Sequence, residues 1–310
     1  ALAGCLCMLS ACLKQLDKFP EAALSDASFW KTTNDLRDAC NNLYFCLPEI
    51  GYNDEAIWSD DGYSSNGPQS ISDGSRLAPA TSADWINNYK YIRRCNSILE
   101  KSGLVTGNAT EVDRYRAEAY FFRAWVYFEM VKRFGDVPLI LRTFDVDDTL
   151  AVAHRTNREQ VLDTAYADLD FAIAHLPAAP VPAAEYGRIT KGAAQALKAR
   201  IGLFEGTFNK FHQQGDAARH LQIAVAATDA MIKDGIYSLF SYAPKPDSSY
   251  YQLFQAAGDG AGNKESILVR LYGENLTNSI ASHNYVRGRW GGSVTPTRTL
   301  MDAYLYVDGL

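Results

Sequence analysis

Two long helical segments constrain the fold of this chain more than any other feature. Residues 116–139 (RAEAYFFRAWVYFEMVKRFGDVPL) and 187–204 (GRITKGAAQALKARIGLF) are both dense in apolar side chains. Over residues 119–131, only Arg123, Glu129 and the hydroxyls of two tyrosines interrupt the apolar surface. A helix that is apolar on several sides must be covered on several sides. The first segment is therefore predicted to lie inside a stack of helices.

Further helices are indicated by apolar side chains at helical spacing and by residues that typically begin or end a helix. They are expected over 26–47, closed by Pro48; 83–102, ending near Gly103; 110–134, stopping at Gly135; 156–176, opened by a capping box of Thr156 and Glu159; 190–208; 216–235; and from Thr297 onward. A strand is expected over Ser266–Tyr272. Trp30, Trp85 and Trp125 lie at helical positions typical of core packing.

These helices also repeat. The alanine pattern of residues 119–128 returns over 194–203, and the pattern of 165–173 returns over 224–232. Small residues at a helix crossing let two backbones approach closely, as in tetratricopeptide-like arrays. Because the two offsets differ, the expected fold is mainly α: irregular tetratricopeptide-like helix-pair repeats (an α-α superhelix) with long loop excursions and a few short strands.

Composition argues against several functions. The net charge of -6, with no basic run, argues against a nucleic-acid partner. The sequence has no Gly-rich phosphate loop before a helix, no HExxH and no GxSxG, so we expect neither an enzyme nor a cofactor. Cys40, Cys46 and Cys95 are predicted to be small buried hydrophobic residues, since three thiols are too few for a disulfide framework.

Metal-ligand patterns are weak. Asp145, Asp147 and Asp148 offer oxygen ligands, but they lack the glycine and the closing glutamate of an EF-hand. We interpret them as solvated acids beside a helix and expect no metal. The five histidines (154, 175, 212, 220 and 283) are scattered, and solvated or capping roles are assigned to them.

The first residues are excluded from fold reasoning. Residues 1–11 are almost wholly apolar, too short to span a bilayer, and end in small residues before Cys12. We interpret them as a truncated lipoprotein signal peptide, with lipidation at Cys12 and Cys5 as the alternative. Several acyl chains would make a stable membrane anchor. The alternative is an ordinary apolar N-terminus that is cleaved to give a soluble secreted protein without a lipid anchor.

The order of several strings resembles a known family. They are Leu16-Asp17-x-x-Pro20, FWKTTNDLRDACNNLY, Trp85-x3-Tyr89-x2-Ile92-x3-Asn96-x2-Leu99, RAEAYFFRAWVYFEMVKRFGDVPL, YADLDFAIAHLP, RITKGAAQALKARIGLF and TPTRTLMDAYLYVDG. No single string is specific, but together they are similar to the SusD/RagB family of outer-membrane lipoproteins. The resemblance covers residues 12–310 as one helical-repeat domain. Because that family usually runs well beyond 310 residues, it also implies that a C-terminal part is missing.

The resemblance implies a non-catalytic role at the cell surface. Members of the family capture an oligosaccharide or polysaccharide for a TonB-dependent (SusC-like) outer-membrane transporter, on which they sit as a lid. It thus implies an outer-membrane protein held by a lipid anchor. A different class remains open from the residues alone, a tetratricopeptide-like scaffold lipoprotein that binds a protein or peptide and no sugar.

Aromatic side chains in loops indicate where a sugar would bind. A pyranose ring offers an apolar face and a rim of hydroxyls, so a binder needs exposed rings beside polar side chains. The excursion 48–81 and the loop 283–292 contain this mixture. The candidate glycan-binding residues are Trp58, Asp60, Asp61, Tyr63 and Asn66 in the first, and Tyr285, Arg289 and Trp290 in the second. A loop tryptophan can instead plug its own loop.

Overall fold

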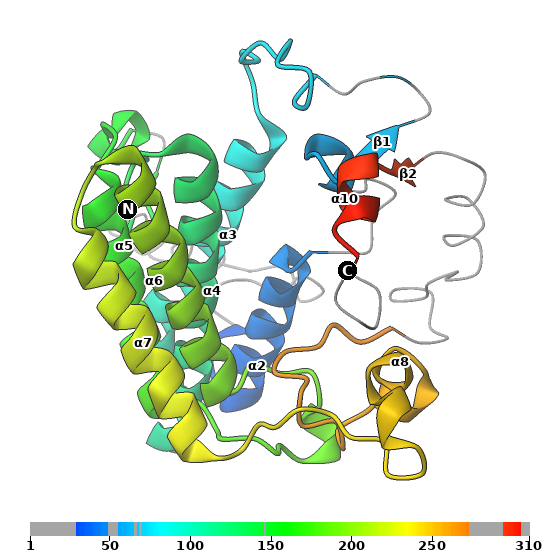
Figure 1. The fold of residues 1–310 in the computed structure, drawn as a ribbon. Helices are drawn as coiled ribbons and strands as arrows, with labels where there is room; N and C mark the ends of the chain where they lie inside the picture. The colour runs from blue at the N-terminus through cyan, green and yellow to red at the C-terminus, as the bar shows by residue number, and fades with distance from the viewer. Residues whose placement is uncertain are drawn as a thin grey trace, which may run out of the picture.

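The computed structural model describes residues 29–48, 55–64, 67, 70–145, 147–272 and 294–304. Its frame is a series of antiparallel helices, each packed against the next (Figure 1). The helices are α2 (Thr33–Asn41), α3 (Ala83–Lys101), α4 (Ala109–Phe134), α5 (Arg158–His175), α6 (Lys191–His212) and α7 (Ala217–Asp234). The pairs α4–α5 and α6–α7 make the most extensive contacts. The predicted mainly α fold of helix pairs is confirmed.

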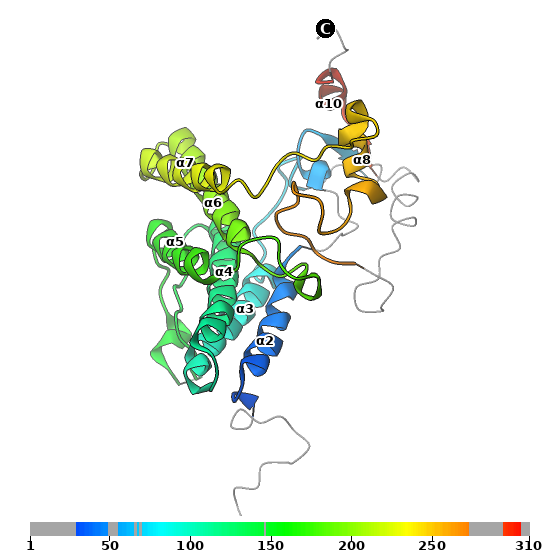
Figure 2. The ribbon, with the colours of Figure 1, turned by 90° about the horizontal axis from the view of Figure 1, so that it is seen from below.

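Short elements complete the described part of the chain. They are the 3-10 helices η1 (Asn42–Cys46), η2 (Glu55–Trp58), η3 (Ser102–Leu104), η4 (Thr149–Val152), η5 (Ala183–Glu185), η6 (Pro246–Ser248) and η7 (Ala256–Gly258), the helices α8 (Ser249–Leu253) and α10 (Arg298–Asp302), and the strands β1 (Gly62–Ser64) and β2 (Val294–Pro296). Helices α5 and α7 lie on one side of α4 and α6, while α8, α10 and the two strands lie on the other (Figure 2). None of the described helices is both long and apolar enough to cross a membrane.

Most helix ends lie where the sequence predicts them. Gly135 ends α4 at a φ of 67°, and Gly235 ends α7 at a φ of 63°, a backbone conformation that glycine adopts without steric cost. The side chains of Thr190 and Asp216 accept backbone N–H groups in the first turns of α6 and α7.

One predicted cap is wrong. The residue that caps α5 is Asn157, whose side chain accepts the N–H of Glu159. Thr156, the predicted cap, instead forms an isolated bridge with Val137, with N···O distances of 3.0 and 3.2 Å. The linker between α4 and α5 thus holds Thr156 outside the helix.

The expected strand over Ser266–Tyr272 is also wrong. This segment contains a bend at Ile267 and Leu268 and forms no strand with any described residue. It is anchored by a side chain, because Arg270 Nη1 donates to the carbonyl of Leu47 at 2.6 Å.

The first helix is shorter than predicted. Helix α2 ends at Asn41 and continues as the 3-10 helix η1.

Helix α4 runs through the core. Phe121, Phe122 and Tyr127 are fully buried, and Trp125 is half-buried against the same core. Trp30 and Trp85 also pack on the core, as predicted. The Arg123 guanidinium is buried and forms an ion pair with Asp168 of α5, a role that the sequence pattern did not predict.

Two glycines of α6 lie where α7 approaches closely. A Cβ at Gly202 would lie 2.6 Å from the carbonyl oxygen of His220 in α7, and one at Gly206 would lie 2.7 Å from the side chain of Leu221. The two segments of the predicted repeat do not place their matching residues in the same environment. Phe128 is 2% exposed, whereas Leu203, its predicted counterpart, is 57% exposed.

Candidate functional site

The two candidate loops are flanked by one small sheet. β1 lies in the excursion 48–81, and β2 follows the loop 283–292; the two strands pair antiparallel, with Tyr63 opposite Thr295. Two further bonds extend the pairing, since Thr297 N donates to Asp61 O at 2.9 Å and Thr295 Oγ1 donates to Tyr63 O at 3.4 Å. Segments far apart in sequence therefore meet at one place, beside α10 (Figure 1).

Two aromatic side chains of the first excursion are exposed. Along β1, Gly62 and Ser64 are buried, so strand alternation turns Tyr63 to the surface, where it is 55% exposed. Trp58, the last residue of η2, is 38% exposed. Both rings are therefore available to a ligand. We call Trp58, Asp60, Asp61 and Tyr63 the Trp58 platform.

The Trp58 platform has unused polar groups. Asp60 and Asp61 are exposed, and neither carboxylate forms a hydrogen bond or ion pair with the part of the chain that the structure describes. Carboxylate oxygens accept hydrogen bonds only, which suits the hydroxyl hydrogens of a neutral sugar. Flat rings beside such acceptors form a surface of the chemistry expected for sugar binding.

The other predicted residues are outside the described residues. This holds for four glycan-binding candidates (Asn66, Tyr285, Arg289 and Trp290) and for both lipidation candidates (Cys12 and Cys5). They stay predictions.

A second concave region surrounds Trp85. A cavity of about 740 Å³ lies between residues 76–86 and the ends of α4 and its linker, and another of about 440 Å³ lies along α3. Both cavities are lined by Trp85 and Ile86. We call these two cavities together the Trp85 cleft. Its cationic lining residues are Arg76, Arg133 and Arg155 in the larger cavity and Lys90, Arg93 and Arg142 in the smaller.

Arg155 is held rigidly in this cleft. Its guanidinium carbon lies 5.0 Å from the centroid of the Trp85 ring. Nη1 donates to the carbonyls of Phe134 and Asp136, at 3.3 and 2.6 Å. Phe134 also packs edge-on against Trp85, with ring centroids 5.1 Å apart. The charge of Arg155 is therefore held by backbone carbonyls, and no carboxylate among the described residues pairs with it.

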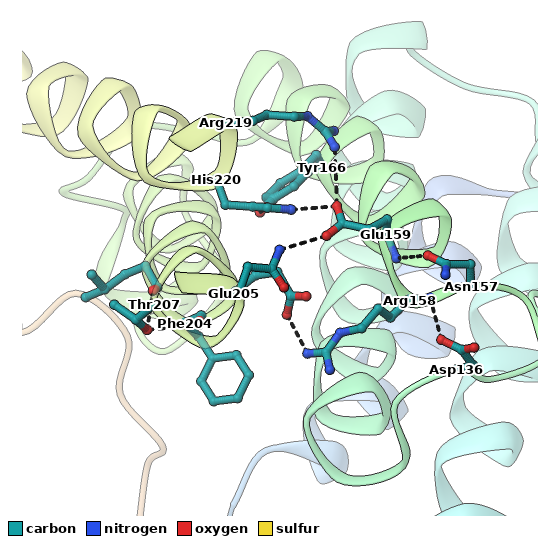
Figure 3. A network of polar contacts seen from close by, with 12 residues as sticks. Asp136, Asn157, Arg158, Glu159, Tyr166, Phe204, Glu205, Thr207, Arg219 and His220 are labelled. Atoms are coloured by element: carbon teal, nitrogen blue, oxygen red, sulfur yellow. Dashed lines mark hydrogen bonds and ion pairs between the residues drawn. The ribbon is translucent and has the colours of Figure 1, made fainter. Parts of the chain in front are cut away.

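A network of polar side chains joins α5 to α6 and α7 (Figure 3). His220 lies between Glu159 Oε2, 2.7 Å from its Nε2, and the hydroxyl of Tyr166, 2.7 Å from its Nδ1. Arg158 donates to Glu205 at 2.6 Å. His220 is 0% exposed, so its predicted solvated or capping role is wrong. The close packing of α7 on α6 turns this imidazole inward, where it joins α5 to α7.

Metal and thiol chemistry have little basis in these residues. No group of three or more His, Cys, Asp or Glu side chains within the described ranges is placed to hold a metal ion. Asp148 forms an ion pair with Arg142 at 2.7 Å, while Asp145 and Asp147 are exposed. Cys40 and Cys95 are buried and free, as predicted. Cys46 is half-buried, and burial raises the pKa of its thiol to about 12, which suppresses the reactive thiolate.

The comparison with known families decides the family. Residues 48–203 match the model of the SusD-like family described as "Starch-binding associating with outer membrane". The chain belongs to the SusD-like family. The match covers the excursion that carries the Trp58 platform and the frame from α3 into α6.

Other SusD-like proteins resemble the chain over most of its length. It is 27% identical over 291 residues to SusD-like protein P2 of Formosa agariphila, an alignment that covers 87% of this chain and 52% of that protein. A crystal structure of a SusD-like protein from Bacteroides fragilis matches with a TM-score of 0.71 and 26% identity, over 94% of this chain and 56% of the other. This chain thus spans little more than half of these relatives.

A third likeness concerns the fold alone. Surface glycan-binding protein A from Bacteroides fluxus matches with a TM-score of 0.59 at 21% identity, over 79% of this chain and 52% of that chain. The helical frame of this SusD-like chain is therefore shared with a protein named for glycan binding.

The Trp85 cleft of this SusD-like chain was not predicted from the sequence. Its cations come from a loop, from α3, from the end of α4 and from the linker that follows, so no local motif joins them. The only local signal is Trp85 itself, whose helical spacing with Tyr89 and Ile92 indicates core packing. That interpretation is correct for the packing of Trp85 on the core. It does not predict that Trp85 also lines two cavities.

Proposed function

We propose that this protein is a non-catalytic glycan-binding protein of the cell surface. It captures an oligosaccharide and passes it to a TonB-dependent (SusC-like) outer-membrane transporter. The observation that carries the proposal is the match of residues 48–203 to a starch-binding family associated with the outer membrane. The exposed rings of Trp58 and Tyr63 supply the chemistry on this chain, beside the exposed carboxylates of Asp60 and Asp61.

The energies explain why more than one ring is needed. Burying about 100 Å² of apolar surface contributes roughly 2.5 kcal/mol, whereas even a millimolar affinity requires about 4 kcal/mol. Two rings with several hydrogen bonds reach that range. Trp58 and Tyr63 lie five residues apart, on η2 and β1, and one sugar chain is proposed to contact both. Tyr285, Arg289 and Trp290 are proposed to extend this surface.

Affinity electrophoresis tests the proposal. The full-length protein is run in native gels with a panel of plant, host and microbial polysaccharides, neutral and charged. We expect at least one polysaccharide to retard it, while a protein of similar charge and size from outside the family migrates unchanged. Retardation by none across a broad panel would contradict glycan binding and favour the peptide-binding scaffold.

Anchoring and transport are separate parts of the proposal. We propose lipidation at Cys12, with Cys5 as the alternative, which would hold the protein at the outer membrane. Mass spectrometry of the membrane-extracted protein should show acyl groups on one of these cysteines, and Cys12→Ala should release the protein from the membrane fraction. A fully soluble wild-type protein would contradict the anchor alone.

A TonB-dependent transporter should co-purify with the protein in mild detergent.

A further inference from the structure

The Trp85 cleft concentrates positive charge on a chain whose net charge is negative. Six Lys and Arg side chains line its two cavities, while the whole chain carries -6. Two of the six have acidic partners: Arg133 bonds Asp84 at 2.9 Å, and Arg142 bonds Asp148 at 2.7 Å. These two pairs neutralise part of the charge at the rims.

The other four cations are uncompensated. Arg76, Lys90, Arg93 and Arg155 have no carboxylate partner within the part of the chain that the structure describes. Arg93 donates to the carbonyl of Phe144 at 2.8 Å, and Arg155 donates to two carbonyls, so both guanidinium groups are held by backbone dipoles rather than by counter-charges. Immobilised cations bind an anion without a further cost of ordering their side chains.

The floor of the cleft is apolar. Trp85 and Ile86 line both cavities, and Ile86 is 50% exposed. Phe134 lines the larger cavity and Phe144 the smaller. A ligand that fits must therefore combine an apolar face with anionic groups at its edge. Cavities of this size are in the range of small-molecule sites, roughly 300 to 1,000 Å³.

The lining favours anions over neutral sugars. Its charged side chains are all donors, and no Asp, Glu, Asn or Gln side chain lines either cavity of the Trp85 cleft. The side-chain acceptors in the lining are the hydroxyls of Thr81, Ser82 and Tyr89. The Trp58 platform has the opposite chemistry, because the Asp60 and Asp61 carboxylates, which pair with no described residue, repel an anion. Arginine forks match the paired oxygens of carboxylates and of related oxyanions.

We propose that the Trp85 cleft binds anionic sugar units, carboxylated or sulfated, of a glycan captured by this protein. The inference rests on the proposed glycan-binding function and names its ligand class. The apolar face of a sugar ring lies against Ile86, beside Trp85 and the Arg155 guanidinium that covers it. Acidic groups lie near Arg76 and Arg155 in the larger cavity and near Lys90 and Arg93 in the smaller. Neutral units of the same chain remain for the Trp58 platform.

Matched polysaccharide pairs test this inference. The full-length protein is run in native gels with dextran sulfate against dextran, and with polygalacturonate against its methyl ester. Within each pair the backbone stays the same and only the charge differs. We expect retardation by the charged member of at least one pair, and which pair responds distinguishes sulfate from carboxylate recognition.

A double variant connects binding to the cleft. Arg76→Gln with Lys90→Gln removes two exposed cations that have no partner among described residues, so the fold should be unaffected. Because each exposed charge pair contributes a factor of about two to five, the affinity should fall roughly tenfold. The matched control, Lys210→Gln with Lys245→Gln, removes the same charge from exposed positions outside the cleft and should bind like wild type.

Each outcome separates the two proposals. Retardation by neutral polysaccharides alone overturns the anionic cleft and leaves glycan binding intact, whereas retardation by none across the wider panel overturns both. Equal losses in the double variant and its control show that only net charge was measured, and overturn the inference. Equally strong binding of poly-glutamate, lost in the same double variant, shows that the cleft recognises charge rather than sugar and also overturns it.

Discussion

Arg123 of α4 and Asp168 of α5 form a two-point ion pair in the protein interior. The distances from Nε to Oδ2 and from Nη2 to Oδ1 are both 2.7 Å. Nη1 of the same guanidinium donates to Oδ1 of Asn96 in α3 at 2.9 Å. One side chain therefore joins three consecutive helices of the frame.

Removing Arg123 should strongly destabilise the protein. Arg123→Met leaves the Asp168 carboxylate buried without a counter-charge, and we expect a loss of about 3 to 5 kcal/mol in the free energy of unfolding. Urea unfolding followed by circular dichroism measures it. The double variant Arg123→Met, Asp168→Leu should recover most of the loss, because no lone charge remains. A loss below about 1 kcal/mol in the single variant would contradict the buried pair.

The contact between α6 and α7 should tolerate no side chain at Gly202. A Cβ there would lie 2.6 Å from His220 O and 2.9 Å from Ala224 N, and both are backbone atoms. We expect Gly202→Ala to lower the free energy of unfolding by about 1 to 3 kcal/mol through overpacking. Gly103→Ala is the control, since nothing lies within 4 Å of that Cβ position. Equal free energies of unfolding for Gly202→Ala and Gly103→Ala would contradict the close approach of the α7 backbone to Gly202.

The ion pair between Arg114 and Glu185 should make stability depend on pH. The hydrogen bond from Arg114 lowers the pKa of Glu185 below its usual value of 4.5. The folded pKa is depressed, so the pair's contribution is fully present above the unfolded pKa and is lost as the pH falls through the folded pKa. We expect Glu185→Gln to cost about 0.5 kcal/mol at pH 7, and the gap from wild type to narrow at pH 3. A gap that stays constant between these pH values would exclude this mechanism.

The rings of the Trp58 platform should matter for ligand binding and not for folding. Tyr63 is 55% exposed and Trp58 38% exposed, so both Tyr63→Ala and Trp58→Ala should stay folded, with the larger loss of stability in Trp58→Ala. Each removes roughly 50 to 100 Å² of apolar contact, which corresponds to about ten- to sixtyfold weaker binding of the retarding polysaccharide. Phe211→Ala removes another exposed ring, on α6, as the control. If both platform variants bind normally, the sugar lies elsewhere.

Local signals in the sequence predict the frame because they act within one helix. Gly135, Asp216 and Gly235 mark helix ends by their own backbone or side-chain chemistry, so their neighbours in space hardly matter. Thr156 and Asn157 are both good caps, and the choice between them depends on the bridge to Val137, which no local pattern reveals. The segment Ser266–Tyr272 has the composition of a strand but finds no strand partner among the described residues.

Of the two candidate binding surfaces, the Trp58 platform can be predicted from the sequence and the Trp85 cleft cannot. The mixture of rings and acids near Trp58 is visible in consecutive residues, and the alternation of β1 turns Tyr63 outward. The Trp85 cleft combines residues from 76 to 155, which only the packing of α3 on α4 brings together. A charge cluster assembled by tertiary structure leaves no trace in a window of neighbouring residues.

The pairing of β1 with β2 closes a loop of very long contour. Tyr63 and Thr295 are separated by 232 residues, and bringing the ends of so long a flexible chain together costs roughly 5 kcal/mol in entropy. Three residue pairs, with hydrogen bonds that each contribute about 1 kcal/mol net, do not offset this cost alone. We therefore expect the helices to form before this two-stranded ribbon, and the ribbon to open before the helices do. Its amide hydrogens should exchange with solvent faster than those of α4, and a glycan that touches both strands would slow that exchange.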